Sequence, residues 1–135
     1  MTKSVRNPKA AWGFLKADHK DAYKQLLLDE EFVNLTLVGL RHPISGQRFA
    51  FGPMVLLFGA ASEVIRYNFF AMAISVLANK ILGLPVLNYF DDFGALVPDI
   101  IKEIGLGAFT WFTSELGALA EDGKSEVSRM LVFWA

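Results

Sequence analysis

The sequence contains no cysteine among its 135 residues, so disulfide bonds and thiolate metal sites are excluded. Residues 1–9 are polar and basic, and no apolar segment of the kind found in secretory signal peptides follows them. The absence of cysteines and of a visible signal peptide is consistent with a protein of a reducing compartment. We therefore expect an intracellular protein, cytoplasmic or nuclear, that is not secreted.

The sequence also has no long hydrophobic run, although 53% of its residues are hydrophobic. Its most apolar stretch is residues 67–79, whose 13 uncharged residues lie between Arg66 and Lys80. A membrane-spanning helix needs about 20 apolar residues. This stretch therefore predicts a buried helix and no membrane association, and a small helical membrane protein is the disfavoured alternative.

The formal net charge is only −1, but the charge is unevenly distributed along the chain. Residues 1–24 carry a net charge of +4, and the remaining residues carry −5. A basic segment of this size can contact nucleic-acid phosphate, and it is equally often an ordinary solvated tail. The length is that of one domain, so we divide the chain into a basic N-terminal segment, 1–11, and a domain, 12–135.

Residue patterns predict an α+β fold in which helices pack on one face of an antiparallel sheet. The expected strands are rich in strand-forming residues or bounded by turns, and they are 12–17, 32–40, 47–56, 84–90, 93–97 and 130–135. The expected helices follow from apolar spacing and cap signals, and they are 21–27, 60–82 and 99–119. Gly83 is the expected stop of the second helix, and Asp99 is the expected N-cap of the third.

Apolar residues of the 60–82 helix recur at spacings of three and four, which predicts one buried face. These residues are Val64, Tyr67, Phe70, Ile74, Leu77 and Ile81. We also place Phe69 and Met72 in the core. His19 and His42 have no partners at metal-ligand spacing, so we expect both of them at the surface.

Two adjacent carboxylates, Asp91 and Asp92, lie within the otherwise apolar stretch 87–96. At a hairpin tip they would form a hard oxygen site of the kind that Mg²⁺ prefers, or simply a solvated turn. Asp18 follows an apolar strand and is the second acidic signal, with a helix N-cap as its alternative role. Two-metal phosphoryl transfer needs carboxylates that hold ions about 4 Å apart. These residues supply that geometry if their strands are neighbours, as a split βαβ fold allows.

Four short stretches agree in order and spacing with the motifs of one enzyme family. They are DHKDAYKQL at 18–26, LLFGAAS at 56–62, YFDD at 89–92 and EDGKSE at 121–126. Through them, residues 12–135 resemble the palm domain of reverse transcriptases, the RNA-directed DNA polymerases of retroelements, and most closely the retrotransposon type. The resemblance implies a polymerase palm with a ferredoxin-like, split βαβ core. It also implies a fragment, because most of the fingers and all of the thumb are missing.

The resemblance implies catalytic roles for four residues. Asp18, Asp91 and Asp92 would hold two Mg²⁺ ions, with Mn²⁺ as a possible substitute. Lys124 would lie near the triphosphate and give a proton to the departing pyrophosphate, although a lysine in an exposed turn is as often inert.

The resemblance also implies substrate-binding roles. Tyr23, five residues after Asp18, would be the steric gate that lies where a ribonucleotide carries its 2′-hydroxyl. Its alternative role is that of a core tyrosine. Phe58 and Gly59 would line the base and sugar of the incoming nucleotide, or else form the turn that enters a helix.

The implied function is template-directed transfer of deoxynucleotides to a primer 3′-hydroxyl. The implied partners are template-primer nucleic acid, deoxynucleoside triphosphates, and the missing fingers and thumb of a longer polyprotein, without which we expect the chain to be inactive. Leu57 departs from the usual proline of the second motif, and Ser62 and Glu63 place a charge near the substrate helix. These departures favour the alternative, a degenerate and inactive retroelement remnant that keeps only the palm fold.

Overall fold

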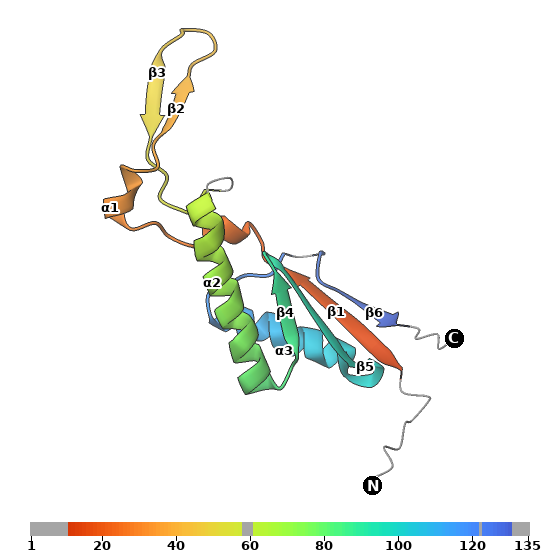
Figure 1. Cartoon of the computed structure of the whole chain (residues 1–135). Helices are drawn as coiled ribbons and strands as arrows, with labels where there is room; N and C mark the ends of the chain where they lie inside the picture. Colours follow the sequence, from red (N-terminus) through yellow and green to blue (C-terminus); the bar gives the residue numbers. More distant parts are fainter. Residues whose placement is uncertain (1–10, 58–60, 122, 131–135) are drawn as a thin grey trace.

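The computed structural model describes residues 11–57, 61–121 and 123–130. Its main unit is a four-stranded antiparallel sheet with strand order β4-β5-β1-β6. The strands are β1 (Trp12–Asp18), β4 (Val86–Tyr89), β5 (Asp92–Pro98) and β6 (Glu126–Met130). Helices α2 (Ala61–Leu77) and α3 (Lys102–Glu115) pack against this sheet (Figure 1). The predicted α+β fold with a helix-covered antiparallel sheet is therefore confirmed.

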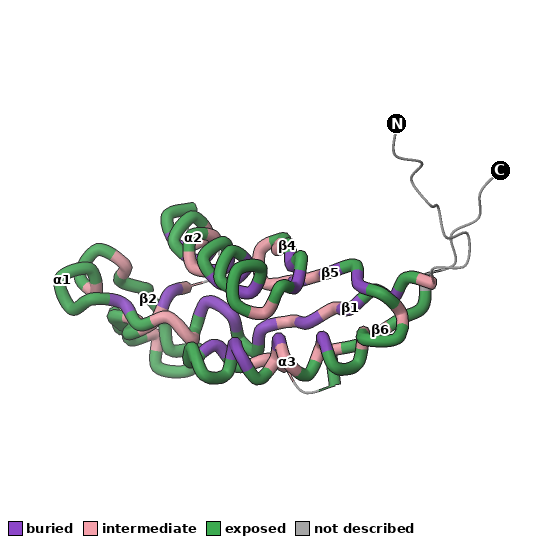
Figure 2. The backbone as a smooth tube through the Cα atoms, turned by 90° about the horizontal axis from the view of Figure 1, so that it is seen from below, coloured by how far each residue is buried: buried purple, intermediate pink, exposed green. Residues whose placement is uncertain are grey.

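The central strand β1 determines which face of the sheet the helices cover. Successive side chains of a strand point to opposite faces, and in β1 Leu15 and Ala17 are buried whereas Trp12 and Phe14 remain partly exposed. The buried side chains lie on the face that carries α2 and α3, and the tube in Figure 2 shows the same alternation along β1. The expected strand at 12–17 is confirmed.

The core fills the space between the sheet and the two helices. Phe93 of β5 contacts Phe109 of α3, with ring centroids 5.4 Å apart, and both side chains are fully buried. A Cβ atom at Gly105 would lie 3.3 Å from a methyl group of Leu15, so the glycine allows α3 to approach β1 closely. This close packing holds the ends of the strands, and hence the acidic motifs, in place.

Helix α2 continues into a single π-helical turn, η2 (Ala78–Leu82). It stops at Gly83, which has φ 66° in the left-handed region that glycine adopts without cost. The helix expected at 60–82 and its glycine stop are thereby confirmed for residues 61–83. Ile81 is exposed rather than buried, since the wider π turn rotates it away from the face that α2 buries.

The buried face of α2 is narrower than the sequence predicts. Tyr67, Ala71 and Ile74 are buried at helical spacing. Phe69 is 67% exposed and Met72 is 55% exposed, so their expected place in the core is wrong. Both residues fall on the opposite side of the helix from Tyr67, because each residue advances the helix by somewhat more than a quarter of a turn.

The third helix differs from its prediction at both ends. A short 3₁₀ turn, η3 (Asp99–Ile101), precedes α3. Asp99 is not an N-cap, because its carboxylate accepts a hydrogen bond from the Lys102 ammonium group at 2.7 Å rather than from a backbone N–H. At the other end, Gly117 has φ 80° and ends the helix before the expected residue 119.

A two-stranded arm, β2 (Val38–Arg41) and β3 (Arg48–Phe51), projects from the main unit (Figure 1). The hairpin expected there is confirmed, but its first strand is much shorter than 32–40. Residues before it form a short helix, α1 (Glu30–Val33), whose N-cap Asp29 accepts a hydrogen bond from the backbone N–H of Glu31. Acidic residues in a first helical turn are stabilised by the positive end of the helix dipole.

Two further elements differ from expectation in extent. The helix expected at 21–27 is a single 3₁₀ turn, η1 (Ala22–Gln25). The last strand begins at Glu126 rather than at residue 130, and residues 131–135 lie outside the described part of the chain.

Candidate active site

Asp91 and Asp92 lie at the tip of the β4–β5 hairpin, where Tyr89 pairs with Asp92 across the two strands. Phe90 has φ 55°, in the left-handed region that bulky side chains rarely adopt. Such a conformation costs a non-glycine residue about 1–2 kcal/mol. The ring of Phe90 packs edge-on against Tyr89 with centroids 4.8 Å apart. The acid pair is thus presented on a strained turn, a feature that clusters at functional sites.

The strand that ends at Asp18 is the immediate neighbour of this hairpin. In the β1–β5 register, Asp18 lies directly opposite Asp92. One residue further on, the backbone N–H of His19 donates to the carbonyl of Asp91 at 3.3 Å. Directly opposite residues of an antiparallel pair have Cβ atoms about 4.5–5.5 Å apart on one face. The backbone therefore brings the two acidic motifs together.

A cavity of about 340 Å³ lies beside the hairpin tip. Asp18, Tyr23, Asp91 and Lys124 line it, and Leu57 contributes part of the wall. These side chains come from all four of the motifs found in the sequence, which are spread from residue 18 to residue 126. A single cavity therefore collects most of the candidate residues.

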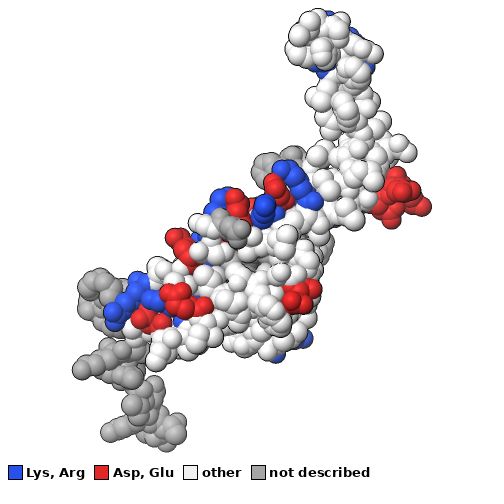
Figure 3. Space-filling model, turned by 180° about the vertical axis from the view of Figure 1, so that it is seen from behind, with Lys and Arg blue, Asp and Glu red and all other residues white. Residues whose placement is uncertain are grey.

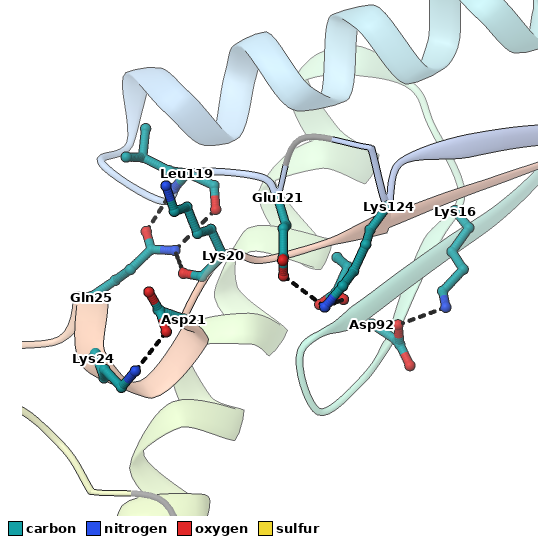
Figure 4. A network of polar contacts seen from close by, with 10 residues as sticks. Lys16, Lys20, Asp21, Lys24, Gln25, Asp92, Leu119, Glu121 and Lys124 are labelled. Carbon is teal, nitrogen blue, oxygen red and sulfur yellow. Dashed lines mark hydrogen bonds and ion pairs between the residues drawn. The ribbon is translucent and has the colours of Figure 1, made fainter.

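Lys124 forms ion pairs with two carboxylates beside the hairpin tip. Its ammonium nitrogen is 2.8 Å from Oε2 of Glu121 (Figure 4). The same nitrogen is 3.4 Å from Oδ2 of Asp18. The hydrogen bond to Glu121, and then the contact with Asp18, raise the pKa of Lys124 above its ordinary value. The backbone N–H of Glu121 donates to the carbonyl of Asp18 at 2.8 Å, which ties this turn to the end of β1.

Asp92 pairs with a different lysine from Asp18 and borders a different hollow. Its Oδ1 is 3.1 Å from the ammonium nitrogen of Lys16, which raises the pKa of Lys16 (Figure 4). Asp92 does not line the cavity at the hairpin tip. It borders a larger hollow on the sheet face that α2 and α3 leave uncovered. Two of the three expected metal ligands, Asp18 and Asp91, therefore share the cavity.

The donor set suits a hard cation. Asp18 and Asp91 offer carboxylate oxygens, which Mg²⁺ prefers over nitrogen or sulfur ligands. Within residues 11–57, 61–121 and 123–130, no group of three histidine, aspartate or glutamate side chains is arranged to hold a metal ion. The cation beside Asp18 in this structure is the ammonium group of Lys124.

Tyr23 is buried in η1 and lines the cavity. Its ring leans on that of Tyr67, with centroids 4.7 Å apart. Burial, and then the charge of Asp91, raise the pKa of Tyr23. The side chain of Gln25 fixes η1 from the other side, because it both donates to and accepts from the backbone of Leu119 (Figure 4). Tyr23 is at once a core residue and a wall of the cavity.

His19 is a residue that sequence reasoning missed. It is 2% exposed, so its expected surface position is wrong. Its Nδ1 is hydrogen-bonded to the hydroxyl of Tyr67 at 2.9 Å, and its ring packs on Phe93. Burial lowers the pKa of His19 from 6.5 to about 4, against an opposing effect of Asp18. The strand alternation contained the signal, since residue 19 follows Leu15 and Ala17 at a spacing of two.

The remaining residues of interest either do not line the cavity or lie outside the residues that the structure describes. His42 is exposed in the arm, as expected, and its Nδ1 accepts from the backbone N–H of Ser45. Phe58 and Gly59 lie outside the described residues. Glu63 is buried at the start of α2, and its Oε2 has no hydrogen-bond partner among the residues that the structure describes.

On the face shown in Figure 3, basic and acidic side chains lie intermixed on the main unit, and the arm is largely uncharged. In the parts of the chain that the structure describes, no helix is both long and apolar enough to cross a membrane. Comparisons with protein-family models and with curated proteins give no match for this chain.

Proposed function

We propose that this chain is the palm region of an RNA-directed DNA polymerase of the retrotransposon type. The observation that carries the proposal is the single cavity lined by residues of all four sequence motifs, with Asp18 and Asp91 beside Tyr23 and Lys124. The reaction would be transfer of a deoxynucleotide to a primer 3′-hydroxyl with release of pyrophosphate. Template-primer nucleic acid, deoxynucleoside triphosphates, and fingers and thumb regions are the corresponding partners.

Asp18 and Asp91 would bind the catalytic Mg²⁺ or Mn²⁺, with Asp92 supporting them from the position opposite Asp18 on the neighbouring strand. When bound, such ions acidify the attacking hydroxyl and neutralise charge on the phosphates. Lys124 stays protonated beside Glu121 and Asp18, so it can supply positive charge or a proton to a phosphate oxygen. Tyr23 occupies the cavity wall and would exclude a 2′-hydroxyl by its bulk, a repulsive contribution to specificity.

A second candidate is an inactive remnant that keeps the palm fold. One observation favours it: Glu63 is buried at the start of α2, and within the described residues its Oε2 has no hydrogen-bond partner. The two candidates share their fold and differ in whether the cavity takes up a divalent cation.

Cleavage of the backbone by bound iron distinguishes the two candidates with the 135-residue chain itself. Fe²⁺ replaces Mg²⁺ in the protein, and ascorbate with peroxide then generates hydroxyl radicals at the bound ion. The proposal predicts cuts near residues 18 and 91, which Mg²⁺ suppresses and Asp18→Asn abolishes. Asp29→Asn, which removes an acid of the α1 cap, is the matched control and should leave the cuts unchanged. Cleavage without this pattern favours the remnant.

A further inference from the structure

A buried hydrogen bond joins the end of β1 to the middle of α2. Nδ1 of His19 and the hydroxyl of Tyr67 are 2.9 Å apart, although the two residues are 48 positions apart in the sequence. His19 is 2% exposed and Tyr67 is fully buried. His19 lies within the first motif stretch, Tyr67 lies outside all four stretches, and neither residue has a part in the chemistry proposed above.

His19 is part of the cavity wall, and Tyr67 packs against Tyr23, another residue of that wall. The Tyr67 ring contacts the Tyr23 ring at 4.7 Å between centroids, with the planes tilted by 34°. On the other side, the His19 ring rests on Phe93 at 4.5 Å. Phe93, His19, Tyr67 and Tyr23 therefore form a continuous row of rings that runs from the core to the cavity.

The contacts in this row differ in how strongly they fix position. Ring-to-ring packing tolerates sliding, because dispersion contacts are individually weak and have no preferred direction. A hydrogen bond is directional, and its length is confined to a few tenths of an ångström. The bond to His19 therefore fixes the tip of the Tyr67 side chain, and Tyr67 in turn is the surface against which Tyr23 leans.

A purely structural role does not require these polar groups. Apolar side chains of the same shape in place of both partners would fill the same space at little net cost. The histidine also leaves Nε2 buried without a hydrogen-bond partner in the described structure, which is unfavourable. Besides filling space, the pair therefore fixes the position of the Tyr67 ring beside Tyr23.

We propose that His19 and Tyr67 are positioning residues that set how far the Tyr23 ring reaches into the cavity. The inference rests on the proposed function, in which that ring excludes a 2′-hydroxyl. Loss of the hydrogen bond lets Tyr67 shift and Tyr23 withdraw, so a ribonucleotide is admitted more easily. Metal binding is unaffected, because neither residue is a ligand.

The test uses Tyr67→Phe in the 135-residue chain, which removes one oxygen and keeps the ring. Calorimetry with Mg²⁺ measures the affinity for dATP and for ATP, and NMR records the through-space contacts of the Tyr23 ring. The expected result is a fall of about fivefold in the preference for dATP, the factor that one hydrogen bond of ordinary net strength represents. Affinity for dATP itself stays within about twofold.

Variants at His19 separate positioning from a general loss of packing. His19→Leu should reproduce the effect of Tyr67→Phe. His19→Asn should retain the parent's preference for dATP, because the asparagine amide can take the place of Nδ1 as the hydrogen-bond partner of Tyr67. Thr110→Val removes a hydroxyl that donates to backbone carbonyls within α3, and because Thr110 does not line the cavity, this variant should change nothing.

The inference is overturned if Tyr67→Phe and His19→Leu both retain the parent's preference and the parent's Tyr23 ring contacts. If the parent binds neither nucleotide, the proposed function fails, and the ring contacts alone decide the positioning claim. Shifted contacts in Tyr67→Phe then support it, and unchanged contacts overturn it.

Discussion

Burial of His19 leads to a quantitative prediction for stability at acidic pH. Its pKa falls from the ordinary 6.5 to about 4, because burial disfavours the charged ring more than Asp18 stabilises it. Since the folded-state pKa is depressed, the unfolded chain takes up the proton first as the pH decreases. The contribution of the neutral histidine is complete above pH 6.5 and is lost as the pH falls toward 4.

The size of the effect follows from the shift. One pKa unit corresponds to about 1.4 kcal/mol. A shift from 6.5 to about 4 therefore predicts a loss of about 3 kcal/mol in the free energy of unfolding across that window. Small domains are stable by only about 5–15 kcal/mol, so this loss should be plain in denaturation curves.

The assay is urea denaturation at a series of pH values in metal-free buffer, on the parent, His19→Asn and His42→Asn. His19→Asn keeps a partner for Tyr67 but cannot titrate, so it should lack the acid-dependent loss. His42→Asn removes an exposed histidine and should lose stability as the parent does. Groups common to all three proteins, such as Asp21 with its pKa lowered by Lys24, cancel in the comparison. Parallel curves for the parent and His19→Asn would refute the reasoning.

Three further predictions concern the metal site and the core. Lys124→Met should raise Mg²⁺ affinity several-fold by calorimetry, because it removes the cation that contacts Asp18; unchanged affinity would contradict competition between lysine and metal. Asp18→Asn should abolish Mg²⁺ binding, whereas Asp92→Asn should only weaken it, since Asp92 lies outside the cavity; equal losses would show that Asp92 is a full ligand. Phe109→Ala should reduce the free energy of unfolding by about 3–5 kcal/mol in urea, because this fully buried ring packs on Phe93; a loss below 1 kcal/mol would place the core elsewhere.

The spacing of apolar residues correctly predicted those helices and strands whose local sequence preference matches the face that they bury. The strand at β1 alternates buried and exposed residues, and α2 repeats its buried residues at helical spacing up to a glycine stop. The acid-rich turn was predictable from Asp91 and Asp92 alone. Such segments need no knowledge of distant partners, because their own pattern defines the face that is buried.

The misses arise where a distant or local contact overrides the pattern. Asp99 was expected to cap a helix, but Lys102 takes its carboxylate. His19 was expected at the surface because it has no partners at metal-ligand spacing, yet the strand carries it inward to Tyr67. The alternation of β1 indicates that His19 is buried, but a count of apolar spacings identifies neither its tyrosine partner nor the lysine that pairs with Asp99.

The ion pairs at the strand ends explain why no three-ligand group is assembled in the described residues. Asp18 and Asp92 face each other across β1 and β5, with Cβ atoms about 5 Å apart. Two carboxylates at that separation repel unless cations neutralise them. Here each has its own lysine, Lys124 at 3.4 Å from Asp18 and Lys16 at 3.1 Å from Asp92.

Under the proposed function, a divalent ion displaces a lysine rather than entering an unoccupied ligand group. The displaced Lys124 remains in the cavity wall beside Glu121, and its charge is then available to the phosphates of a nucleotide. Metal binding would therefore strengthen nucleotide binding through Lys124 as well as through the metal itself, and by linkage the nucleotide would strengthen metal binding by the same factor. In Lys124→Met the part of this coupling that depends on the lysine disappears, so tighter Mg²⁺ binding should be accompanied by a smaller effect of Mg²⁺ on nucleotide affinity.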